Sequence, residues 1–123
     1  MLNRKGFLPS DELSKVVVKG MKEKKAEDIV VLDLRFVPNS VADFFVICTG
    51  NSDTQVASIS DSVETTVLKT DQQNPWHVEG KSSREWVLID YVDVVAHVFK
   101  EETREFFGLE DLWGDAKITQ IAS

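Results

Sequence analysis

The feature that most restricts the fold of this chain is an unbroken apolar run, Phe-Phe-Val-Ile-Cys, at residues 44–48. Successive side chains of a β-strand point to opposite faces, so a strand that is apolar at every position is buried on both faces. The polar segment 50–53, Gly-Asn-Ser-Asp, follows and ends the run. We therefore predict that residues 44–48 form a central strand of a sheet.

Periodic apolar patterns on both sides of this run predict the other elements. Ser10 precedes two acidic residues, which favours a helix start there, because acidic side chains stabilise the positive end of a helix. Ser52 and Gln55 form a capping box before a second helix, and Gly108 ends a third. In chain order, we predict a helix at 10–25, a strand at 29–36, the central strand at 44–48, a helix at 53–69, a short strand at 76–80, strands at 85–91 and 93–99, a short helix at 101–107 and a turn at 109–113.

The length of 123 residues and this order of elements favour one α/β domain over 1–123, with helices packed on one layered mixed sheet. Its core is expected at about 10–116, and the tail at 117–123 is expected to be weakly ordered. The single cysteine, Cys48, excludes a disulfide framework and a cysteine-based zinc cluster. No apolar run approaches the roughly 18 residues that cross a bilayer, and residues 1–9 lack the apolar core of a signal peptide, so we expect a cytoplasmic protein.

The charge of the chain is unevenly distributed. Residues 1–25 contain seven basic and three acidic residues, a sum of +4, whereas the whole chain carries −7, so the remaining residues sum to −11. An acidic body repels phosphate backbones, so we expect no direct nucleic-acid recognition. Its natural partner is a basic surface, usually that of another protein, although acidic residues also serve simply to keep a chain soluble.

Candidate catalytic residues are few. Asp90 and Asp93 have the spacing of paired carboxylates that bind magnesium in nucleotidyl or phosphoryl transfer, but no basic residues nearby would hold a triphosphate. Aspartates also favour turns, and these two flank a predicted turn, so we prefer the turn role. His97 shares a strand face with Val95 and Phe99, which predicts a buried structural histidine. We expect neither a metal nor a cofactor.

Large aromatic residues gather in the acidic second half of the chain. Between Asp90 and Asp115 there are eight acidic and two basic residues, a sum of −6. Aromatic side chains among acidic ones are typical of a patch that binds a basic, partly apolar protein, whereas the alternative is that the rings belong to the core. The aromatic residues concerned are Trp76, Trp86, Tyr91, Phe106, Phe107 and Trp113.

Four blocks of sequence, in this order and spacing, resemble the bacterial ribosomal silencing factor family, also called Iojap-like. The blocks are DFFVICTGNS at 43–52, VEG at 78–80, EWVLIDYVDVVAHVF at 85–99 and LEDLWGDA at 109–116. The resemblance implies a nucleotidyltransferase-like topology without the catalytic site, which accounts for strand acids without a phosphate-holding basic set. It also implies a translation repressor that binds a basic protein of the large ribosomal subunit, the fourteenth of the bacterial series, and blocks joining of the small subunit.

By analogy with the family, we expect a partner-binding face made of Trp86, Leu88, Asp90, Tyr91, Asp93, Leu109 and Trp113. Two alternatives remain. One is a magnesium-dependent nucleotidyltransferase-like enzyme that uses Asp90 and Asp93, and the other is an assembly factor of the large subunit. The sequence also leaves open a homodimer of the free protein.

Overall fold

Ten helices and strands make up the part of the chain that the structure, a computed structural model, describes, namely residues 7–122. They follow one another as α1 (Ser10–Glu23), β1 (Glu27–Asp33), β2 (Phe44–Gly50), α2 (Asp53–Asp71), β3 (His77–Glu79), β4 (Trp86–Asp90), β5 (Val94–Lys100), α3 (Glu101–Phe107), α4 (Leu109–Leu112) and β6 (Lys117–Gln120). None of these helices is long and apolar enough to cross a membrane.

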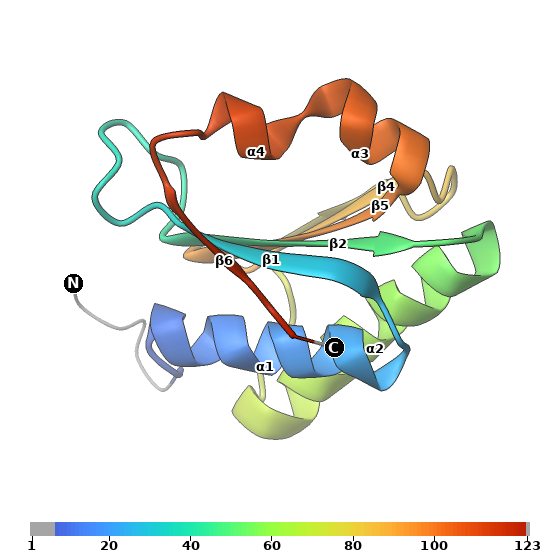
Figure 1. Ribbon diagram of the computed structural model, residues 1–123. Helices are drawn as coiled ribbons and strands as arrows, with labels where there is room; N and C mark the ends of the chain where they lie inside the picture. The colour runs from blue at the N-terminus through green and yellow to red at the C-terminus, as the bar shows by residue number, and fades with distance from the viewer. Residues whose placement is uncertain (1–6, 123) are drawn as a thin grey trace.

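The strands form one six-stranded sheet in the order β3-β4-β5-β2-β1-β6. β2 and β5 run parallel, and the other neighbouring strands run antiparallel. Helices α1 and α2 cover one face of the sheet, and α3 and α4 lie over the other (Figure 1). The predicted single α/β domain with helices packed on a mixed sheet is confirmed.

The central strand β2 is buried at all seven of its positions, as its apolar sequence predicts. Its alternate side chains pack into two separate cores. Phe44, Val46 and Cys48 belong to the core between the sheet and helices α1 and α2. Phe45 and Ile47 belong to the smaller core on the face beneath α3 and α4. The sheet is therefore packed on both faces, and the smaller core lies next to the predicted binding face.

Helices α1 and α2 approach closely at Gly20. A Cβ atom there would lie 2.8 Å from the Cα atom of Val63, a distance that the α2 backbone cannot relieve without moving. The Ser62 hydroxyl also donates a hydrogen bond of 2.7 Å to the Gly20 carbonyl. Glycine at this position therefore sets the spacing of the helix layer beneath the sheet.

The two predicted helix starts differ in detail. Ser52 caps α2, since its Oγ accepts the amide of Gln55 at 3.1 Å, while the Gln55 side chain accepts the amide of Asn51. At α1, by contrast, Pro9 occupies the N-cap position and Ser10 is already helical. The Ser10 hydroxyl donates to Asp43 Oδ2 at 2.7 Å instead, so it ties α1 to the residue that precedes β2.

The C-terminal tail is more ordered than its sequence predicts. Residues 117–120, predicted to be weakly ordered, form β6 and pair with β1 in antiparallel register. All four residues of β6 are exposed, and the strand lies at the edge of the sheet beside β1 (Figure 1). An edge strand without a buried face shows no apolar alternation, which is why its sequence pattern was not informative.

Candidate partner-binding face

The predicted face is built around alternate residues of β4. Trp86, Leu88 and Asp90, here called the β4 row, point to the side of the sheet that carries α3 and α4, and each is half-buried. Val87 and Ile89 alternate with them and are fully buried in the opposite core. The β4 row therefore keeps part of its surface accessible on one side of an otherwise buried strand.

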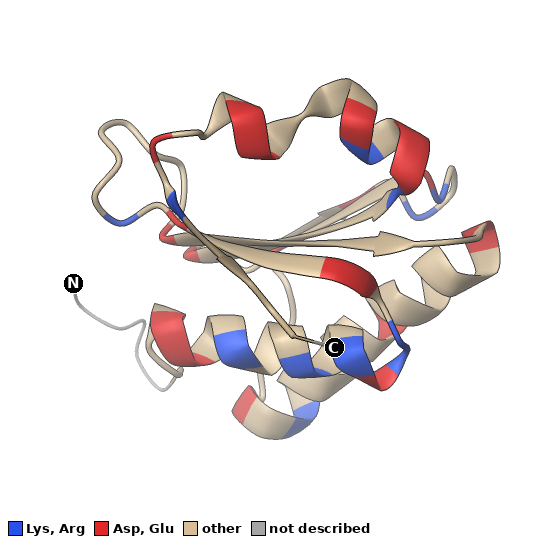
Figure 2. Cartoon of the chain, viewed as in Figure 1, with Lys and Arg blue, Asp and Glu red and all other residues tan. Residues whose placement is uncertain are grey.

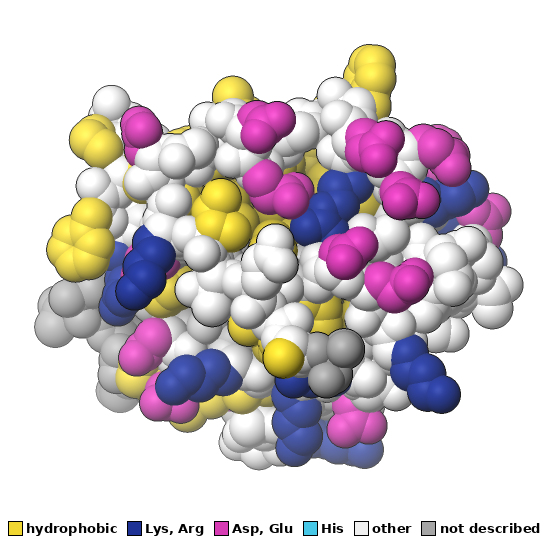
Figure 3. All heavy atoms as spheres, in the orientation of Figure 1, with side chains coloured by type: hydrophobic (Ala, Val, Ile, Leu, Met, Phe, Trp, Pro, Cys, Tyr) yellow, Lys and Arg dark blue, Asp and Glu magenta, His cyan; other side chains and the backbone are white. Residues whose placement is uncertain are grey.

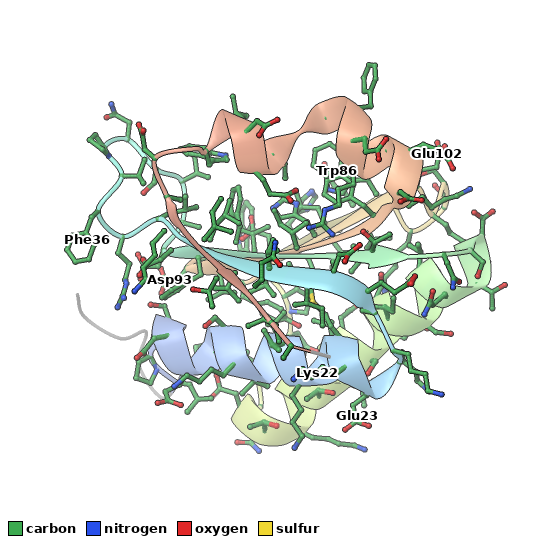
Figure 4. All side chains as sticks on the ribbon, in the orientation of Figure 1. Lys22, Glu23, Phe36, Trp86, Asp93 and Glu102 are labelled. Carbon is green, nitrogen blue, oxygen red and sulfur yellow. The ribbon has the colours of Figure 1, made fainter. Side chains whose placement is uncertain are left out.

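Trp86 is held by contacts from two directions. Its indole Nε1 donates a hydrogen bond to Nδ1 of His97 at 3.1 Å. Its ring stacks on Phe99 with centroids 4.8 Å apart, and the Phe107 ring of α3 approaches from above at 4.7 Å. Trp86 thus lies between the sheet and α3 (Figure 4), so it is a fixed element of the face.

His97 is the buried structural histidine that the strand pattern predicts, with 2% of its surface exposed. Burial lowers the pKa of its imidazole to about 3, so the ring is neutral near pH 7. Because Nδ1 accepts the hydrogen bond from Trp86 Nε1, the single ring N–H proton of the neutral imidazole resides on Nε2. Nε2 is buried and has no hydrogen-bond partner among residues 7–122.

We expect His97 to make folding stability depend on pH. In the unfolded chain this histidine titrates near pH 6.5, whereas in the folded protein its pKa is about 3. Between pH 7 and pH 5 the unfolded state therefore binds a proton that the folded state does not, and the free energy of unfolding should fall by about 2 kcal/mol. Urea unfolding at both pH values measures the loss. In His97→Gln most of this pH dependence should disappear, and an unchanged dependence would contradict the assignment.

The turn between β4 and β5, residues 91–93, is tied together by hydrogen bonds. Asp90 Oδ1 accepts the amide of Val92 at 2.7 Å, which is a turn role of the kind we predicted. The carbonyl of Asp93 accepts two amides, those of Asp43 at 2.8 Å and Phe44 at 3.1 Å. Within residues 7–122 no group of three His, Cys, Asp or Glu side chains is placed to bind a metal ion.

Tyr91 does not belong to the face, which corrects the sequence-based expectation. Its side chain is fully buried and lies in the core on the α1 and α2 side of the sheet. Burial there, together with the nearby Glu64 carboxylate, raises the pKa of the Tyr91 phenol. The side chain stabilises the fold and cannot reach a partner on the other face of the sheet.

Leu109 and Trp113 both contribute to the protein's own packing. Leu109 is only 9% exposed and joins the core beneath α3 and α4. Trp113 is half-buried and meets Phe45 edge to face, with ring centroids 6.0 Å apart. The structure therefore groups Trp113 with Trp86 and Leu88 on one apolar cluster, but much of the Trp113 ring serves the protein's own packing. Asp93 lies at one end of this face, in the turn (Figure 4).

Acidic side chains predominate on α3 and α4, which are coloured red over much of their length in Figure 2. The two basic residues of this region are already paired, Lys100 with Asp53 at 3.0 Å and Arg104 with Glu110 at 3.1 Å. Four exposed acids of these helices make no ion pair within the described part of the chain, namely Glu101, Glu102, Glu105 and Asp111. Acidic side chains accordingly gather at this surface, with exposed apolar side chains between them (Figure 3).

Arg104 fixes these helices to the sheet, a role that sequence analysis missed. Its guanidinium donates to the Asp28 carbonyl and to Thr49 Oγ1, both at 2.8 Å, and to both carboxylate oxygens of Glu110. No residue of α3 is fully buried, so these bonds add to the packing of Phe107, Leu109 and Trp113 in holding the segment in place. The only local signal is the spacing of Arg104 and Glu110, because Asp28 and Thr49 are distant in sequence.

Comparison with known proteins gives a consistent result. Residues 8–123 match the family described as Ribosomal silencing factor during starvation. The chain is 38% identical over 120 residues to the ribosomal silencing factor of Bacillus subtilis, which covers 98% of this chain and 95% of that protein. It is also 38% identical over 114 residues to the ribosomal silencing factor of Halalkalibacterium halodurans, covering 93% and 96% of the two chains. A crystal structure of a protein from Chromobacterium violaceum superposes with a TM-score of 0.81 at 32% identity, covering 94% of this chain and 95% of that one.

Proposed function

We propose that this chain, which belongs to the ribosomal silencing factor family, binds the large ribosomal subunit and prevents the small subunit from joining it. The contact is made with a basic protein of the large subunit, the fourteenth of the bacterial series. The domain then represses translation in the cytoplasm by occupying space that the small subunit needs. This role requires no catalysis, no metal and no cofactor.

One observation carries the proposal: the half-buried apolar residues of the β4 row, Trp86 and Leu88, and a surplus of acids that form no ion pair occur on the same side of the sheet. Trp86 and Leu88 offer apolar surface beside α3 and α4, whose exposed carboxylates make no ion pair within residues 7–122. Proteins of the ribosome bind RNA and are therefore basic, so an acidic surface attracts them over a distance. Trp86 and Leu88 then supply the short-range apolar contact that holds the complex together.

The proposed roles of the contact residues follow from their burial. Trp86 and Leu88 are apolar anchors, and Trp113 contributes the part of its ring that its own core leaves exposed. Asp90 and Asp93 lie at the edge of the contact, where they orient basic side chains of the partner. Leu109 acts indirectly, since it supports α4 from beneath.

Sedimentation of a cell lysate through a sucrose gradient tests this proposal. Tagged protein should move with free large subunits and be absent from small subunits and joined ribosomes. Movement with small subunits only, or retention at the top of the gradient, would contradict it. Association with immature large subunits, without any effect on subunit joining, would favour the assembly-factor alternative instead.

A further inference from the structure

The turn at residues 91–93 contains a residue whose backbone conformation is unfavourable for its side chain. Val92 has a φ of 76°, in the left-handed region that glycine and asparagine tolerate but a β-branched residue rarely adopts. Five hydrogen bonds hold this turn. The amides of Tyr91, Val92 and Asp93 each donate one, and the carbonyl of Asp93 accepts the amides of Asp43 and Phe44. None of these bonds involves the valine side chain, so the turn itself does not require valine.

The Val92 side chain also contributes little to the packing of the two cores. It is 43% exposed and belongs to neither of the two cores. A glycine here would form the same turn without the strain, so valine costs stability and returns little packing. A strained residue that remains 43% exposed and belongs to neither core points to a contact outside the chain.

The surroundings of Val92 indicate what kind of contact it makes. Asp90 precedes it, and its carboxylate accepts the Val92 amide, while Asp93 follows directly. The backbone amide of Trp76 donates a hydrogen bond of 2.8 Å to the Asp90 carbonyl, so the Trp76 backbone lies next to the end of β4. Trp76 is 73% exposed. Two exposed apolar residues, Val92 and Trp76, are therefore held by backbone hydrogen bonds at the end of β4, where Asp90 and Asp93 also lie.

We propose that Val92 and Trp76 form an apolar anchor that extends the partner-binding face around the end of β4. This inference rests on the proposed function, and the partner is the same basic protein surface. Lysine and arginine carry apolar stems below their charged groups, so such a side chain can pack its stem on Val92 or the Trp76 ring and direct its charge to Asp90 or Asp93. The strain at Val92 is kept because glycine would remove one half of this contact.

Two substitutions at Val92 separate binding from folding. Val92→Gly and Val92→Asn both suit a positive φ, and both remove the apolar side chain. The melting temperature of each variant should equal or exceed that of the original protein, while affinity for purified large subunits should fall about tenfold. Trp76→Ser should weaken binding in the same direction, since its exposed ring contributes little to the core.

Arg84→Gly is the matched control, because Arg84 also has a positive φ, 58°, but lies before the opposite end of β4. It should leave binding undiminished. Unchanged affinity of both Val92 variants would overturn this inference alone, and so would a melting temperature lowered by several degrees, because the side chain would then serve the fold. Failure of the original protein to bind large subunits would overturn the proposed function, and this inference with it.

Discussion

Leu88→Arg is expected to weaken binding to the large ribosomal subunit by about a hundredfold or more. Leu88 is the middle residue of the β4 row and half-buried, so an arginine there places a positive charge in the centre of the face. Opposite a basic partner, like charges brought together cost several kcal/mol, and each 1.4 kcal/mol is about a factor of ten in affinity. Equilibrium binding of the purified variant to isolated large subunits measures the change.

Leu68→Arg provides the matched control. Leu68 is 46% exposed on α2, the helix that covers the opposite face of the sheet, and the substitution changes the net charge by the same amount. It should leave affinity within about twofold. Leu88→Gln, which removes the apolar contact without adding charge, should be intermediate. Equal effects of arginine at both leucines would mean that binding responds to total charge, and the face would then lie elsewhere.

Arg104→Met is expected to lower the free energy of unfolding by about 2–3 kcal/mol. The Arg104 side chain is only 11% exposed, and its loss leaves the Asp28 carbonyl, Thr49 Oγ1 and the Glu110 carboxylate without their donor. Methionine replaces part of the apolar stem, so the loss reports mainly on the polar contacts. Urea unfolding, followed by tryptophan fluorescence, measures it.

Lys100→Met is the control for this second substitution. Lys100 makes one ion pair, with the 57% exposed Asp53, and such surface pairs contribute under about 1 kcal/mol. A similar loss for both variants would mean that Arg104 is an ordinary surface residue. If instead Arg104→Met weakens binding without lowering stability, the guanidinium would be a contact residue, which contradicts its role as the attachment of α3 and α4.

Most of the fold could be predicted from the sequence, because burial leaves a periodic pattern. The run at 44–48 predicts a strand buried on both faces, and the structure confirms it. The helical spacing of the apolar residues of α2 and the capping residue Ser52 likewise predicted that helix. The edge strand β6 was not, since none of its side chains is buried and its pairing with β1 depends on backbone groups common to all residues.

The candidate site was predicted less completely, because some of its features depend on contacts between distant segments or on backbone conformation. The β4 row follows from strand alternation, and the same alternation places Tyr91 with Ile89 on the other face, so the analogy with the family was wrong there. The contacts of Arg104 join segments far apart in sequence and leave no local pattern. The strain at Val92 is a property of the backbone, which composition does not reveal.

Reassociation of purified subunits tests most directly whether the bound domain keeps the ribosomal subunits apart. Small and large subunits are mixed at a magnesium concentration that normally joins them, with increasing amounts of the protein added to the large subunits beforehand. Joined ribosomes should decline as the protein saturates the large subunits, and Leu88→Arg at the same concentrations should leave joining intact. Joined ribosomes that form undiminished while the original protein remains bound to the large subunit would contradict this prediction.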